Sequence, residues 1–201
     1  MDQMPSSPPA LNAAHIAGIA AQHDLRAIEM LFDRYGSERA RIITEPPRDQ
    51  ILDPQIAAFW TYYQDMRDRR GGAPPLWSDF SLADARDLVG SLHVLARDEE
   101  TGDMRYLIFG TDVAARYGRD LTGQLVANQA ASLAVVFHGL FQAAATNDHC
   151  YYSTHYPPED GPVRDCQRLI VPFHGNNDRF YRLVVAHKPA RTPRSQVGGT
   201  L

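Results

Sequence analysis

The residues of this sequence best suited to metal chemistry are His149, Cys150 and His155, which lie within one short segment. Imidazole and thiolate are ligands that zinc prefers, but this spacing does not by itself form a tetrahedral set. Adjacent residues of a strand point to opposite faces, so His149 and Cys150 would not face the same ion. His174 also falls beside an expected strand. We therefore predict no metal site.

Catalytic signatures are absent from the sequence, which contains no GxSxG, HExxH, Walker-type or GxGxxG motif. The charged residues in the segments 65–70 and 84–87 are typical of solvated helix faces rather than of acid–base pairs. Cys150 and Cys166 lack CxxC spacing, which favours small buried thiols. We predict that the protein is not an enzyme. The alternative is an enzyme whose Tyr, His and Asp side chains are brought together only by the fold.

The composition indicates a folded protein with no affinity for nucleic acid. The chain has 201 residues, of which 44% are hydrophobic and 22% are charged, as expected of one domain with extensions. A net charge of −4 and a pI near 6.0 leave no surplus of basic groups to neutralise phosphates or acidic membranes. No apolar run is long enough to span a bilayer, and residues 1–10 lack the features of a signal peptide. We expect a cytoplasmic location.

The segment 104–125 is the most tightly organised part of the sequence. An alternating pattern predicts a strand that ends at Gly110. Thr111 and Asp112 are both suited to cap the start of a short helix, and Gly118 suits a left-handed C-cap at its end. The segment therefore predicts a strand, a short helix and a sharp corner in direct succession.

Residues 105–123, RYLIFGTDVAARYGRDLTG, resemble the centre of a PAS domain. The similarity is to a bacterial PAS-like family in which a strand ends in Gly-Thr and a short helix leads into Phe or Tyr followed by Gly-Arg-Asp-Leu-Thr-Gly. In this chain that run is residues 117–123. The similarity extends in order over residues 54–189. It implies a PAS-like fold and a role in sensing or protein interaction, and it implies no particular ligand.

Some PAS domains bind haem through a histidine on the long helix before the last three strands, and His138 lies on the corresponding helix here. Phe137 and Leu140 flank it, so its imidazole could serve as an axial ligand. An ordinary partly buried histidine fits the same pattern. Arg116 and Arg119 could anchor propionates, yet they fit a polar loop as readily. We therefore predict that haem is absent, and the identity of any cofactor stays unknown.

The chain is predicted to have three parts: a tail, helix and linker at residues 1–53, a PAS-like domain at 54–189 and a flexible tail at 190–201. Residues 11–35 contain no proline and many alanines, which predicts one continuous helix. Two prolines among charged residues indicate that 39–53 is a linker.

The predicted domain alternates helices and strands. Asp53 as N-cap and Pro54 at the first helical position predict a helix with one apolar stripe, formed by Ile56, Phe59, Trp60, Tyr63 and Met66. Ser81 and Asp84 resemble a capping box for a helix to about Val89. A long helix is expected over 127–147, and strands are expected over 91–97, 104–109, 150–156, 164–173 and 180–187. The pattern predicts an α+β fold with a five-stranded antiparallel sheet and flanking helices.

The resemblance implies a non-catalytic sensory or protein-interaction domain, in which a small ligand could bind between the sheet and the long helix. Binding would shift the arrangement of the terminal helices and so signal to a protein partner. Alternation predicts the residues that line the cavity: Tyr106, Ile108, Tyr117, Val136, Phe137, Leu140, Phe173 and Val184. The alternative is a structural adaptor with a filled core and no ligand.

The N-terminal helix is predicted to make the protein a homodimer. Two heptad positions form a continuous apolar stripe along it, and the expected contact residues are Leu11, Gly18, Leu25, Ile28 and Phe32. Small residues in the middle of the stripe would let a second helix approach closely. The alternative is that the stripe folds back onto the sheet of its own chain.

Overall fold

The computed structural model describes residues 12–129, 132–157 and 163–191. Its centre is a six-stranded antiparallel sheet in the order β1-β4-β5-β6-β2-β3. The strands are β1 (Glu38–Thr44), β2 (Leu92–Arg97), β3 (Met104–Ile108), β4 (Tyr151–Tyr156), β5 (Val163–His174) and β6 (Phe180–Arg191). The α+β class is confirmed, whereas the sheet has six strands and not the predicted five.

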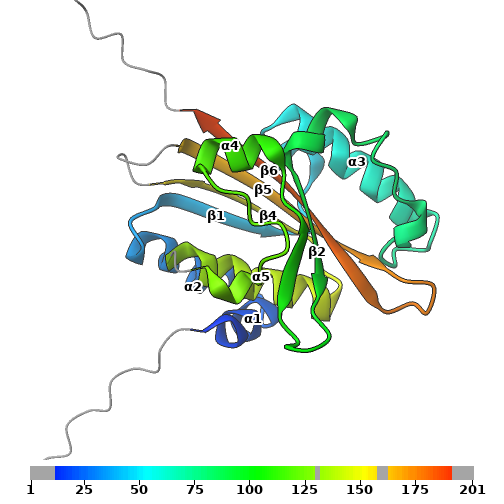
Figure 1. Cartoon of the computed structure of the whole chain (residues 1–201), viewed down its shortest axis with the longest axis horizontal. Helices are drawn as coiled ribbons and strands as arrows, with labels where there is room; N and C mark the ends of the chain where they lie inside the picture. Colours follow the sequence, from blue (N-terminus) through cyan, green and yellow to red (C-terminus); the bar gives the residue numbers. More distant parts are fainter. Residues whose placement is uncertain (1–11, 130–131, 158–162, 192–201) are drawn as a thin grey trace, which may run out of the picture.

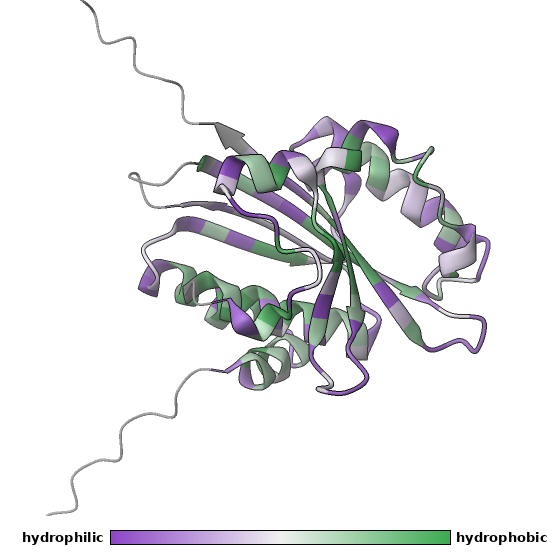
Figure 2. Ribbon diagram, in the orientation of Figure 1, coloured by the Kyte–Doolittle hydropathy of each residue, from purple (hydrophilic) through white to green (hydrophobic). Residues whose placement is uncertain are grey.

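Helices cover both faces of this sheet (Figure 1). One face carries α1 (Ala13–Ala21), α2 (Leu25–Arg34), α4 (Thr111–Tyr117) and α5 (Ser132–Asn147), and the other carries α3 (Pro54–Asp68). The 3-10 helices are η1 (Arg48–Gln50), η2 (Trp77–Asp79), η3 (Arg86–Ser91) and η4 (Val126–Asn128). α5 is largely hydrophobic in Figure 2, as expected of a helix that lies between α1 and the sheet. Among the described helices, none is both long and apolar enough to cross a membrane.

The helix α3 forms as predicted. The Asp53 carboxylate accepts hydrogen bonds from the backbone N–H groups of Gln55 and Ile56, each at 2.9 Å, and Pro54 occupies the first turn. The predicted apolar stripe is buried along its whole length. Tyr63 at its centre donates a hydrogen bond of 2.8 Å to the carbonyl oxygen of Pro172, which fixes α3 to β5.

The prediction of one continuous N-terminal helix is wrong. α1 and α2 are separated at His23, which has a left-handed φ of 58°, and the Asp24 carboxylate then caps α2 by accepting from the N–H of Ala27. Ile28 and Phe32 are fully buried in the core of their own chain. The stripe therefore folds back onto the sheet, and these two residues do not form a free surface for a second helix.

The other predicted dimer residues have varied positions. Gly18 is exposed and Leu25 is half-buried. Leu11 lies outside the described residues. The homodimer itself stays a prediction.

The prediction that residues 39–53 form a linker is also wrong, because most of β1, the strand missing from the predicted sheet, lies within them. β1 pairs with β4, so that Ile42 lies opposite Ser153 and Thr44 lies opposite Tyr151. Alternation within Glu38–Thr44 turns Ile42 into the core while Arg41 stays exposed. The folded unit thus begins well before residue 54: β1 belongs to the sheet, and α1 and α2 contribute residues to the core cluster on one of its faces.

Three element boundaries also differ from the predictions. The α-helix predicted from Ser81 to about Val89 does not form: the Ser81 hydroxyl accepts a hydrogen bond from the N–H of Ala83 in a turn, and η3 comes next. The long helix begins at Ser132, after η4, and not at residue 127. β6 continues to Arg191, past the predicted start of the tail, and the rest of that tail lies outside the described residues.

The corner after β3 is confirmed. Gly118 ends α4 in the left-handed conformation, with φ 70° and ψ 17°. Gly110 takes the N-cap position that was predicted for Thr111 or Asp112. It lies so close to the chain before β2 that a Cβ atom would be 2.5 Å from the carbonyl oxygen of Gly90.

Replacing Gly118 with valine should lower the free energy of unfolding by at least about 1 kcal/mol, because a β-branched residue tolerates positive φ poorly. A Cβ atom at this position would meet no atom of the described residues within 4 Å, so backbone strain is the expected cause. Urea denaturation measures the loss. Gly118→Asn is the matched control, since asparagine enters the left-handed region more readily. Equal stability of the valine variant and the native protein would contradict the assigned turn.

Candidate ligand-binding cavity

A cavity of about 260 Å³ lies between the sheet and α5, next to the corner that follows β3. Most of its wall is apolar and includes Tyr106, Phe109, Leu121, Leu133, Phe137 and Phe141. The remainder is polar and is formed mainly by strand residues, namely His93, His155, Arg168 and His187. The cavity thus combines an aromatic and aliphatic wall with a compact polar wall on the sheet.

Strand register brings the polar residues together. Arg168 on β5 lies directly opposite Ser153 on β4 and opposite His187 on β6, so the three side chains form one row across the sheet. His155 follows Ser153 by two residues and therefore faces the same side. His93 reaches this group from β2, with its Nε2 atom 3.2 Å from Nδ1 of His187.

A chain of hydrogen bonds fixes where the protons of two histidines lie. The backbone N–H of Gly110 donates to Nδ1 of His93 at 3.1 Å, so His93 carries its proton on Nε2. This proton is donated to Nδ1 of His187, so neutral His187 carries its own proton on Nε2. Nε2 of His187 is buried and has no hydrogen-bond partner among the described residues. The chain therefore leaves one unpartnered N–H donor on the polar wall.

The histidines of the polar wall are neutral near pH 7. Burial lowers the pKa of His93 and of His155 to about 3, and the positive charge of Arg168 adds to the effect. Burial and the same arginine hold the pKa of His187 well below its usual range. Arg168 is consequently the charged member of this group.

Arg168 has an aromatic contact but no counter-ion among the described residues. Its guanidinium carbon lies 3.8 Å from the centre of the Phe137 ring, which is a cation–π geometry. Its Nη1 atom is buried and finds no hydrogen-bond partner in the part of the chain that the structure describes, and the same holds for Nδ1 of His155 and Oγ of Ser153. Among the described ion pairs, none includes Arg168. Arg168 as a whole is half-buried, and an anion beside its buried Nη1 would stabilise a cation that is partly removed from water.

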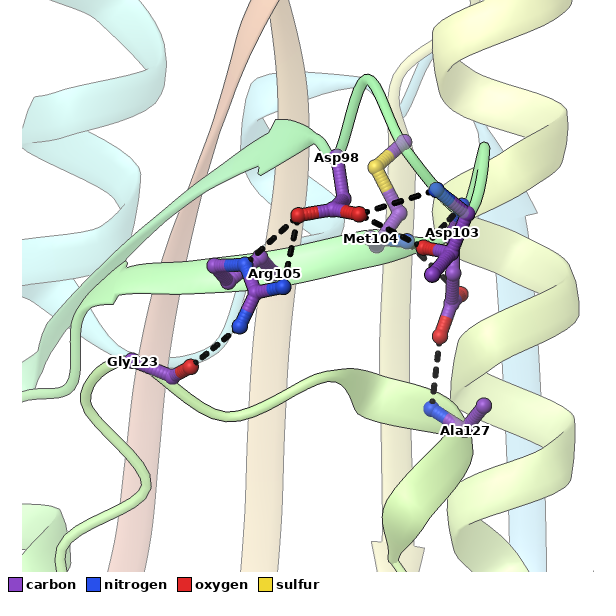
Figure 3. A network of polar contacts seen from close by, with 7 residues as sticks. Asp98, Asp103, Met104, Arg105, Gly123 and Ala127 are labelled. Atoms are coloured by element: carbon purple, nitrogen blue, oxygen red, sulfur yellow. Dashed lines mark hydrogen bonds and ion pairs between the residues drawn. The ribbon is translucent and has the colours of Figure 1, made fainter.

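The segment that forms one side of the cavity is tied to the β2–β3 hairpin by polar contacts (Figure 3). Arg105 pairs with Asp98 at 2.6 Å and also donates to the carbonyl oxygen of Gly123 at 2.7 Å. The Asp103 carboxylate accepts from the N–H of Ala127 at 3.0 Å. These bonds hold residues 121–129, which include the lining residues Leu121, Val126 and Gln129.

Three of the eight predicted lining residues line the cavity: Tyr106, Tyr117 and Phe137. Val136 and Leu140 are buried in the same core cluster but do not line it. Their proposed role in ligand binding stays a prediction.

The structure places the other three predicted lining residues elsewhere. Ile108 is 45% exposed, because a register shift opposite Val94 and Leu95 breaks the alternation of β3. Phe173 and Val184 lie on the opposite face of the sheet, in the cluster under α3. Both faces are covered, so both alternate sets of strand residues are hydrophobic, and hydrophobicity alone did not identify the face.

Sequence reasoning missed the polar wall. The signal that could have found it is strand spacing: Arg168 is two residues from Ile170, and His187 is two residues from Val185. Each pair shares one face of the sheet. A charged residue and a histidine in phase with core residues of adjacent strands indicate a buried polar group.

His138, weighed as a haem ligand, does not line the cavity. Its Nε2 atom pairs with the Asp103 carboxylate and also lies 3.1 Å from Nε2 of Gln142. The absence of haem stays a prediction. Within the described ranges, no three His, Cys, Asp or Glu side chains are grouped as a metal site would require. Cys150 and Cys166 are buried free thiols, and burial raises the pKa of both.

Comparison with known proteins adds no relative of this chain. No protein-family model, no curated protein and no solved structure matches it. The function is therefore inferred from the cavity itself.

Proposed function

We propose that this chain is a PAS-like sensory domain that binds a small ligand between the sheet and α5. The observation that carries the proposal is the cavity of about 260 Å³, because its polar wall contains buried atoms to which the described residues offer no partner. Solid cores satisfy their buried polar groups, whereas ligand sites keep a few polar groups for the ligand. The PAS-like corner adds support, because Tyr117 and Leu121 from that segment line the same cavity.

The proposed output is a shift in the position of the N-terminal helices. α5 separates the cavity from α1, and Gly139 of α5 packs closely against Ile16 of α1. A ligand that favours one position of α5 would therefore change the population of α1 positions at the surface. A protein partner, a homodimer or both would respond to that change. Catalysis by this domain is not part of the proposal.

The test is whether the purified full chain retains or gains a small molecule in the cavity. We expect native mass spectrometry to show a bound mass, or a small-molecule library to contain compounds that raise the melting temperature. Ala134→Trp, which fills space beside the lining, should abolish either effect. Ala58→Trp on the exposed side of α3 is the matched control and should retain it. An apo mass together with no stabilising compound would overturn the proposal in favour of a structural adaptor.

A further inference from the structure

We infer that the cavity takes an organic monoanion, with a carboxylate on Arg168 and an apolar body against α5. This inference rests on the proposed function of the cavity as a ligand site. It concerns the chemical class of the ligand, and it follows from the charge, the donor pattern and the size of the cavity.

Charge is the first argument. Arg168 is the guanidinium on the strand side of the cavity, and the described residues provide it with no carboxylate. The neighbouring histidines are neutral, so Arg168 is the charge of the polar wall itself, and one negative charge balances it. Arg116, whose charge also acts on His187, does not line the cavity. Arg119, the other lining arginine, is exposed and remains solvated. A dianion such as a phosphate ester would bring a second charge into the buried part without a partner.

The donor pattern is the second argument. Buried Nη1 of Arg168 and Nε2 of His187 are both N–H donors that meet no acceptor from residues 12–129, 132–157 or 163–191, and they come from residues directly opposite each other on β5 and β6. A carboxylate accepts through two oxygens and matches the fork of a guanidinium. An ammonium or amidinium ligand would bring further donors to a wall that needs acceptors. The polar wall therefore favours a ligand group that accepts hydrogen bonds and carries a negative charge.

Cavity size limits the remainder of the ligand. An apolar cavity of about 150 Å³ accommodates benzene, so about 260 Å³ corresponds to about ten non-hydrogen atoms. Phe137 and Phe141 of α5, with Leu121 and Leu133, provide an apolar wall for that body. A medium-chain fatty acid and a small aromatic acid both have this amphipathic form.

Calorimetric titration of the full chain with octanoate and octanamide tests the inference. The two probes have the same number of non-hydrogen atoms and differ in charge. We expect octanoate to bind at least about tenfold more tightly, because hydrogen bonds to charged groups contribute about 1.5–3 kcal/mol. Equal affinities, or tighter binding of octanamide or of octyl phosphate, would overturn the inference. This comparison requires no variant.

Variants then locate the contact. Arg168→Gln should weaken octanoate binding at least about tenfold and change octanamide binding little. Arg182→Gln is the matched control, since it removes the same charge from the face shared with Val184, away from the cavity. Unchanged octanoate affinity in Arg168→Gln would contradict the assignment. If neutral library compounds occupy the cavity while octanoate does not bind, the inference fails and the proposed ligand-binding function stands. If no compound binds at all, both fail.

Discussion

Lowering the pH from 7 to 5 should destabilise the protein by about 4 kcal/mol through His93 and His155 alone. Both have a pKa of about 3 in the folded state, against the ordinary value of 6.5 expected after unfolding. Between these values the unfolded chain binds protons that the folded chain excludes, so stability falls as the pH drops below 6.5. Each histidine contributes about 1.4 kcal/mol per pH unit in this range. His187, whose pKa is also lowered, acts in the same direction.

Urea unfolding at pH 7, 6 and 5 measures this loss, and a variant isolates one histidine. His155→Gln removes one titrating group, so its stability should fall by about 2 kcal/mol less than that of the native protein over the same range. His15→Gln, at an exposed position of α1, should leave the pH dependence unchanged. The same pH dependence in the native protein and in His155→Gln would show that His155 is not held neutral by burial.

Gly139→Ala should destabilise the protein by about 2 kcal/mol or more, although alanine normally favours a helix. A Cβ atom on Gly139 would lie 2.5 Å from the Cβ and Cγ2 atoms of Ile16 and 2.9 Å from the carbonyl oxygen of Ala13. α1 would have to move away from α5, and overpacking of this kind typically costs about 1–3 kcal/mol. The higher helix propensity of alanine stabilises the helix by up to about 1 kcal/mol, which does not offset that loss.

Gly18→Ala in α1 is the matched control for this prediction. A Cβ atom there meets nothing within 4 Å in the described part of the chain, so the substitution should raise the free energy of unfolding by about 0.5–1 kcal/mol. Denaturant midpoints of the two variants, measured side by side, separate packing from helix propensity. A gain of stability in both variants would mean that α1 does not pack on α5 through Gly139.

The sequence was sufficient for elements with local signals. Asp53 and Pro54 predicted the start of α3, and Gly118 predicted the end of α4, because caps and left-handed glycines depend on neighbouring residues alone. β1 was missed because only pairing with β4, more than a hundred residues later, makes a strand of a charged segment. The break at His23 was missed because the residues on either side of it have helical patterns. Tertiary contacts, rather than local propensity, decide such positions.

The site was predicted only in part for the same reason. Tyr106, Tyr117 and Phe137 were found because they lie on the segments that frame the cavity. Arg168 and His187 become a site only through the register of β5 with β6, which no local pattern records. Strand spacing could have indicated that they face the core, but not that their donors would lack partners.

The hydrogen-bond chain from Gly110 through His93 to His187 also has an evolutionary consequence. Its first donor is a main-chain N–H, which every amino acid except proline supplies. Mutation of the side chain at position 110 therefore cannot reverse the direction of the chain, even though close packing against Gly90 disfavours most substitutions there. For His187 to present an acceptor to a ligand in place of its N–H donor, His93 or His187 itself would have to change. The backbone at position 110 thus determines the donor at His187, whereas the charge of the site depends on the side chain of Arg168.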